Sequence, residues 1–222
     1  MRRGVSAVAV AATTASAAIL AVIGLTGCPP ASVGPVDLAK PTRSFRARDY
    51  ERELDRWTRY GSYLRQLDTT LRLYATWRGP RYDAAYIAKR QKMFGLPQRD
   101  VDALRRERET SRAKALTFVL VAATHDISWN DFDRRPSHWR LSLRNDRGEQ
   151  VAPISVKQHR RTTATDIAFF PHLRKLFHTR YTVRFPRAIL GGKPLIDSST
   201  TSLTLRASGA LGKVELTWKL RR

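Results

Sequence analysis

The hydrophobic pattern divides the chain into an apolar start, a middle part with helical spacing and a later part with alternating residues. Residues 4–25 carry no charge and are mostly Ala, Val, Ile and Leu. Between residues 57 and 74, large apolar residues recur at intervals of three or four, which is the spacing of one helix face. The members of this stripe are Trp57, Tyr60, Leu64, Leu67, Leu71 and Tyr74.

The pattern predicts two to three helices in the range 43–115. The stripe indicates a first helix over about 47–77, which would pack on other parts of the same chain. A seam for a partner protein is the alternative. Pro80 is well placed to open a second helix that ends at Gly95, and a mostly charged third helix is expected over 99–114.

After residue 115 apolar residues alternate with polar ones, which is typical of strands with one buried face. Six short strands separated by turn residues predict an antiparallel β-sandwich that is immunoglobulin-like in architecture. The expected fold class is therefore α+β, with the helical segment first. The expected strands are 116–123, 139–144, 151–157, 180–185, 203–205 and 214–219.

The start of the chain is typical of a secretory signal, because a short basic stretch precedes the apolar run. The run ends in Leu25, Thr26, Gly27 and Cys28, which resemble the lipobox of bacterial lipoprotein precursors. The resemblance implies that residues 1–27 are a signal peptide that is removed. It also implies that Cys28 carries a diacylglyceryl group and anchors the mature chain to a membrane. An uncleaved membrane-spanning helix is the alternative, because the run is long enough to span a bilayer.

The sequence predicts four parts, and the lipobox implies where the first ends. Residue 29 is Pro rather than the Asp that keeps lipoproteins of enteric bacteria in the inner membrane, so the outer membrane of the cell envelope is favoured. The next residues are rich in proline and are expected to form a flexible tether. The parts are a signal peptide (1–27), a lipidated cysteine with a linker (28–42), a helical region (43–115) and a β-sandwich domain (116–222).

Composition narrows the function further. The chain has 222 residues, is 42% hydrophobic and contains one Cys. A single Cys excludes an intramolecular disulfide framework and any cysteine-rich zinc site. The formal net charge of +22 indicates anionic partners or surroundings.

Basic residues occupy the polar positions of several expected strands. If these strands share one sheet, they present a basic face that would bind anionic lipid, lipopolysaccharide or an acidic polymer. An ordinary solvated surface is the alternative. The candidate anion-binding residues are Arg140, Arg144, Arg180, Arg184 and Lys219.

No catalytic, metal-binding or cofactor-binding residue is assigned. The chain contains no nucleophile-elbow, phosphate-loop or dinucleotide motif. All five histidines lie after residue 115, and Asp126, Ser128 and Asn130 alternate as oxygen ligands do in calcium loops. The glycine and the later glutamate of such loops are missing, so these side chains are expected to cap turns instead.

The leading hypothesis is a membrane-anchored lipoprotein of the bacterial envelope with a non-catalytic binding or scaffolding role. The alternative is an envelope hydrolase that acts on cell-wall material, with a site among the His and Asp residues of the β domain. A nucleic-acid partner is disfavoured, because the signal implies export and RNA-binding motifs are missing.

Substituting Cys28→Ser tests the anchor directly. Because the thiolate is the acceptor of the diacylglyceryl group, we expect the variant to lose all label from a radioactive fatty-acid precursor and to leave the membrane fraction. Thr26→Ser keeps a small residue before the cysteine and should retain the label. Equal labelling of the Cys28→Ser chain and the native chain would contradict the lipobox assignment.

Overall fold

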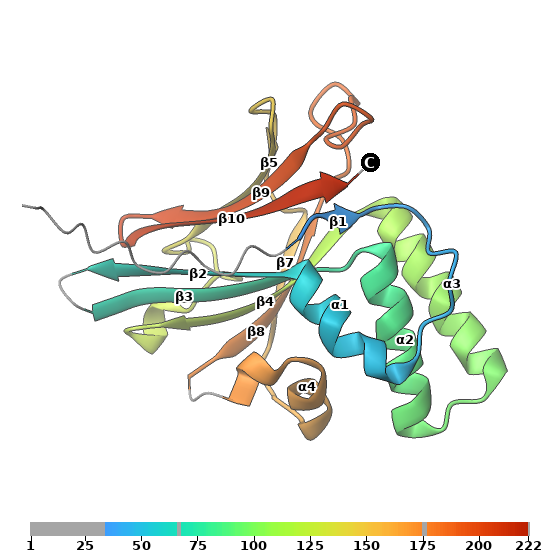
Figure 1. Ribbon diagram of the computed structural model, residues 1–222. Coiled ribbons are helices and arrows are strands. Elements are labelled where there is room, and N and C mark those ends of the chain that lie inside the picture. The colour runs from blue at the N-terminus through green and yellow to red at the C-terminus, as the bar shows by residue number, and fades with distance from the viewer. Residues whose placement is uncertain (1–33, 66–67, 175–176, 222) are drawn as a thin grey trace, which may run out of the picture. The chain divides into compact units, whose positions relative to one another are not determined.

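The computed structural model describes residues 34–65, 68–174 and 177–221, and residues 33–222 form one compact unit. The predicted signal peptide and Cys28 lie outside the described residues. Within the described part, the chain forms four α-helices and two β-sheets (Figure 1). The helices are α1 (Tyr50–Trp57), α2 (Pro80–Phe94), α3 (Gln98–Lys114) and α4 (Ala164–Phe169).

Each sheet has five strands, and the strand orders are β1-β10-β9-β5-β6 and β2-β3-β4-β8-β7. Neighbouring strands are antiparallel except β1 and β10, which are parallel. The first sheet contains β1 (Val36–Asp37), β10 (Gly212–Arg221), β9 (Ser202–Gly209), β5 (Arg140–Asn145) and β6 (Gln150–Val151). The second contains β2 (Thr58–Arg65), β3 (Asp68–Trp77), β4 (Leu116–Thr124), β8 (Thr179–Phe185) and β7 (Ser155–His159). The fold is therefore α+β, as expected.

The two sheets pack through aromatic side chains on their apolar faces. The ring of Trp218 on β10 lies 5.2 Å from that of Phe118 on β4 and 6.3 Å from that of Trp77 on β3. The indole nitrogen of Trp218 donates a hydrogen bond of 2.9 Å to the carbonyl oxygen of Trp57, where α1 ends. Because these rings are almost fully buried, they form the centre of the core.

The prediction of one helix over 47–77 was wrong. The helix α1 ends at Trp57, and the chain then forms a hairpin in which Tyr60 of β2 lies opposite Tyr74 of β3. The same segment also contains a strand pattern, in which every second residue is apolar. This pattern prevails, because these alternate residues of β3 are buried in the core. These are Leu71, Leu73, Ala75 and Trp77. The stripe with spacings of three and four combines residues from both faces of the hairpin, and Tyr60 and Leu64 are exposed.

Gly61 explains why the hairpin is preferred at this point. A glycine inside a helix costs about 1 kcal/mol relative to alanine. On β2 its missing side chain makes room for the other sheet, since a Cβ atom there would lie 2.7 Å from Val214 and 2.9 Å from Leu216. The residue that weakens a helix therefore allows the two sheets to approach closely.

The helices α2 and α3 confirm the other helical predictions. Pro80 occupies the first turn of α2, and Gly95 caps its end with a φ of 59°, a conformation that favours glycine. The helix α3 begins one residue earlier than the expected range 99–114 and ends at the same residue. Local signals at the ends of these helices were sufficient because they do not depend on distant contacts.

Residue 115 was expected to separate a helical region from a β domain, but helices and strands occur on both sides of it. The strands β2 and β3 share a sheet with β4, β8 and β7 from the second half of the chain. The helix α4 lies within the expected β domain, where Thr163 and Asp166 form a capping box. Its last turn contacts α1, because the hydroxyl of Tyr50 donates a hydrogen bond of 2.6 Å to the carbonyl oxygen of Phe169.

Part of the expected flexible linker is also ordered. Val36 is fully buried, and it pairs with Leu220 at the edge of the first sheet. A proline-rich composition did not reveal this contact, because a strand of two residues has no periodicity. The flexible prediction for 28–42 was therefore wrong at residues 36–37.

The close contact between Gly79 and Trp57 predicts a large effect of one methyl group. A Cβ atom at Gly79 would lie 2.0 Å from the Trp57 ring. We expect Gly79→Ala to lower the free energy of unfolding by about 2 kcal/mol through overpacking. Urea titration followed by tryptophan fluorescence measures this change. Gly34→Ala is the control, because nothing lies within 4 Å of a Cβ atom there, and equal effects of both substitutions would contradict the packing argument.

Candidate functional site

The outward face of the first sheet combines polar side chains from three neighbouring strands. Arg140 and Arg144 of β5 alternate with the buried residues Leu141 and Leu143. The strand register places Arg144 opposite Thr204 of β9, which in turn lies opposite Thr217 of β10. Residues that face each other in a register point to the same side of a sheet. Polar side chains of β5, β9 and β10 therefore share one surface.

Basic residues outnumber acidic ones on this surface, which we call the basic face. Its basic residues are Arg140, Arg144, Arg206, Lys213, Lys219 and Arg221, and its acidic residues are Asp37 and Glu215. The carboxylate of Glu215 lies 3.7 Å from Arg206 and 3.8 Å from Lys213. Arg140, Arg144 and Lys219 are exposed and form no salt bridge with any described residue. Their charges are therefore available to a ligand.

The prediction that five basic residues share one face was wrong for Arg180 and Arg184. Both lie on β8 in the second sheet. Arg180 is paired with Asp166 of α4 at 2.6 Å, and Arg184 lines a hollow beside α3. Alternation along a strand shows which residues face outward, but it does not show which sheet the strand joins. The same alternation in β9 and β10 was a sufficient signal for Arg206, Lys213 and Arg221.

His138 and Asp131 form a pair in the loop before β5. The ring nitrogen Nδ1 of His138 lies 2.8 Å from the carboxylate of Asp131, which is 4% exposed. The hydroxyl of Ser137 donates to the same carboxylate at 2.9 Å. In a serine hydrolase the hydroxyl would donate to the imidazole. Asp131 therefore holds the loop before β5 together instead of completing a catalytic triad.

Of the remaining histidines, His159 lies on β7, whereas the rings of His172 and His178 both lie beside the ring of Tyr74 on β3. The imidazole of His159 on β7 lies 2.8 Å from the hydroxyl of Thr182 on β8. The ring of His172 stacks on Tyr74 with 4.0 Å between ring centroids. A catalytic site requires such groups to converge on one substrate. This arrangement counts against the hydrolase alternative.

The segment resembling a calcium loop has structural roles. The side chain of Asp126 accepts a hydrogen bond of 2.7 Å from the backbone nitrogen of Ser128 and caps a short 3-10 helix at Ile127–Trp129. The amide of Asn130 donates to the carbonyl oxygen of Ala122 at 3.0 Å. The capping prediction is thus confirmed for Asp126. Within the ranges that the structure describes, no three metal-ligating side chains are placed to hold an ion.

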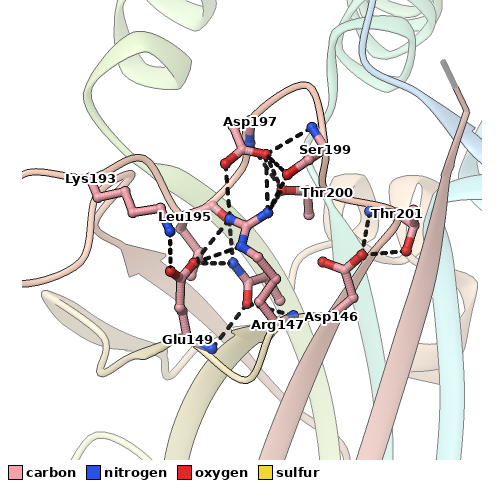
Figure 2. Close-up of polar contacts among 10 residues, drawn as sticks. Asp146, Arg147, Glu149, Lys193, Leu195, Asp197, Ser199, Thr200 and Thr201 are labelled. Atoms are coloured by element: carbon pink, nitrogen blue, oxygen red, sulfur yellow. Dashed lines mark hydrogen bonds and ion pairs between the residues drawn. The ribbon is translucent and has the colours of Figure 1, made fainter.

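A dense polar network joins the turn after β5 to the loop before β9 (Figure 2). The guanidinium group of Arg147 lies 3.0 Å from the carboxylates of both Glu149 and Asp197. Lys193 donates a hydrogen bond of 2.5 Å to Glu149. Hydrogen bonds from the side chains of Lys193 and Asn145, together with the contact with Arg147, lower the pKa of Glu149 to about 2. The carboxylates are fully engaged at neutral pH, so the network acts as a clamp on the loop.

Comparison of the chain with protein-family models, with curated proteins and with solved structures finds no match. Among the helices of the described residues, none is both long enough and apolar enough to cross a membrane.

The Glu149 clamp predicts a specific dependence on acid. The folded-state pKa of about 2 lies below the ordinary value of 4.5. The clamp therefore stabilises the fold fully above about pH 4.5, and this contribution is lost as the pH falls toward 2. Lys193→Met should raise the pKa of Glu149, as measured by the carbon-13 shift of its carboxyl group against pH.

Lys213→Met is the matched control, because Lys213 lies beside Glu215 and not beside Glu149. It should leave the Glu149 titration unchanged. A native Glu149 that titrates near 4.5 would contradict the clamp.

Proposed function

We propose that this protein is a lipid-anchored, non-catalytic binding protein of the bacterial cell envelope. Its anchor is a diacylglyceryl group on Cys28, and its binding surface is the basic face. The ligands are anionic headgroups of membrane lipid or lipopolysaccharide. Pro29 stands directly after Cys28, in place of the Asp that keeps lipoproteins of enteric bacteria in the inner membrane, which favours the outer membrane as its location.

The observation that carries this proposal is the position of β1. This strand is the edge of the sheet that carries the basic face, and it pairs directly with β10. Cys28 lies only eight residues before Val36, and a fully extended chain of that length reaches at most about 29 Å. The proposed anchor and the basic face are therefore joined by a short segment. Such a tether raises the effective concentration of headgroups near the face.

The chemistry of the face suits phosphate groups. Arg and Lys side chains bind phosphate through charge-assisted hydrogen bonds. The hydroxyl groups of Thr204 and Thr217 lie between the basic residues of β5 and β10, with their oxygens 2.8 Å apart. Because one of these hydroxyls donates to the other, the pair supplies one neutral donor to an oxygen atom of a headgroup. A flat array of this kind suits a repeated anionic surface.

The packing of two mostly antiparallel sheets supports the immunoglobulin-like architecture as part of this proposal. In a sandwich, the two inner faces form the core, and the outward face of a sheet is free for binding. The helices α1, α2, α3 and α4 lie beside the second sheet and at one end of the described part (Figure 1). The first sheet is thus the more open of the two.

Neutralising the basic face should weaken membrane binding. The test uses the mature-length chain with Cys28→Ser, so that no acyl group contributes. Each basic residue near an anionic surface contributes about 1 kcal/mol. The triple substitution Arg140→Gln, Arg144→Gln and Lys219→Gln should therefore weaken binding to phosphatidylglycerol vesicles about a hundredfold. Vesicle sedimentation at two salt concentrations measures this change.

The matched control removes the same charge from the helices, through Lys92→Gln, Arg99→Gln and Arg106→Gln. These side chains are exposed and lie on α2 and α3. The control should weaken binding only slightly. If both triple variants weaken binding equally, net charge alone explains the attraction and the basic face has no special role.

A further inference from the structure

A cavity of about 420 Å³ lies between the segment 40–45 and the helices α2 and α3. Its lining includes the apolar side chains of Phe45, Ile87 and Val101. It also includes the basic side chains of Arg105, Arg108 and Arg112 of α3. The cavity is separate from the basic face, since none of its lining residues belongs to β5, β9 or β10.

The carboxylate of Asp83 lies at the base of this cavity and meets more than one cation. Asp83 is 3% exposed. Its oxygens lie 2.8 Å from Arg112, 3.2 Å from Arg108 and 3.6 Å from Arg78. The three arginine side chains are themselves mostly buried, at 25%, 12% and 18% exposed. Three guanidinium groups around one carboxylate leave an excess of two positive charges.

Further observations show that the cluster is not balanced within the described residues. The Nε atoms of Arg78 and Arg108 are buried and have no hydrogen-bond partner there. Arg187 adds a fourth guanidinium group, which donates to the carbonyl oxygen of Arg112 at 2.8 Å. Burial, together with the charge of Arg108, lowers the pKa of Arg78.

The other acidic residue of the lining does not offset this excess. Glu109 is partly exposed and lies 3.5 Å from Lys40, which is itself basic. Buried charge without a counterion is costly, and leaving a buried donor unpaired adds to that cost. An anion in the cavity that contacts Arg108 and Arg112 would offset the excess positive charge.

We propose that this cavity binds a phosphate monoester. A phosphate monoester carries a charge of about −1.5 to −2 at neutral pH, which matches the excess of the arginine cluster. Arginine also binds phosphate oxygens with paired donors. The cavity has the size of a site for a small organic ligand, so the organic part of the ester lies against Phe45 and Ile87 while the phosphate meets Arg108 and Arg112.

The shared chemistry is the monoester phosphate, and two sources supply it. One is a soluble ester, and the other is a membrane lipid with a terminal phosphate. Phenyl phosphate represents the first and phosphatidate vesicles represent the second. Both arms are compared with groups of lower charge: phenyl sulfate for the soluble ester and phosphatidylglycerol, a phosphodiester, for the lipid.

The test measures calorimetric binding of these probes to the full-length chain. We expect phenyl phosphate to bind more tightly than phenyl sulfate, because only the phosphate carries the second charge. It should also bind more tightly than inorganic phosphate, because only the ester contacts the apolar side chains of the lining. Preference for phosphatidate vesicles over phosphatidylglycerol vesicles would identify the lipid as the source. The proposal would be overturned if phenyl phosphate bound no more tightly than phenyl sulfate, or no more tightly than inorganic phosphate.

Asp83→Asn separates a binding site from a purely structural ion cluster. The substitution keeps the shape and removes the competing carboxylate, so affinity for phenyl phosphate should rise about tenfold. The melting temperature should fall in chloride buffer and recover on adding phenyl phosphate. A structural cluster would lose stability without any gain in affinity.

Arg105→Gln covers the case in which the first variant fails to fold, because the Arg105 side chain is 54% exposed and lies on the cavity wall. It should weaken phenyl phosphate binding severalfold. Arg140→Gln on the basic face is the matched control and should leave it unchanged. An unaltered affinity in Arg105→Gln and in a folded Asp83→Asn chain would overturn the proposal, whatever the outcome for the basic face.

Discussion

The contact of Trp218 with Phe118 and Trp77 is the interaction on which the rest of the structure depends. It joins the two sheets at their apolar faces, and the hydrogen bond from Trp218 to the backbone of Trp57 fixes the end of α1 at the same point. Because this contact fills the space between the sheets, all charged side chains must lie outside it. The large positive charge of the chain is therefore distributed over the polar positions of both sheets, the helices and the loops.

Local signals were enough to predict α2, α3 and most strands after residue 115. The expected strand over 151–157 is instead two strands, β6 and β7, which belong to different sheets. Proline and glycine mark the ends of α2, and alternation identifies β5, β8, β9 and β10. The helix expected over 47–77 ends at Trp57, because two periodicities coexist in the residues that follow and only contact with the other sheet decides between them. The choice of sheet for Arg180 and Arg184 failed for the same reason, since strand pairing is a long-range property.

The two basic regions differ in physical character. On the basic face, side chains such as Arg144 and Lys219 are solvated, so their attraction to anions is long-range and weakens with salt. In the cavity beside α3, the guanidinium groups around Asp83 are partly desolvated, and their geometry is held by the helix. Arg108 and Arg112 are one helical turn apart. That spacing was visible in the sequence, but the carboxylate between them comes from α2.

The parallel pairing of β1 with β10 has a mechanical consequence. A force applied to the residues before β1 would act first on Val36. This residue is held by its buried side chain and by the pairing of a two-residue strand with β10. Such a short strand detaches under tension before the longer strands behind it. After detachment of this strand the load would pass to Leu38 and Phe45, which pack against the core before the short 3-10 helix at Ala47–Asp49 begins. The first sheet would thus lose its edge strand before its longer strands separate.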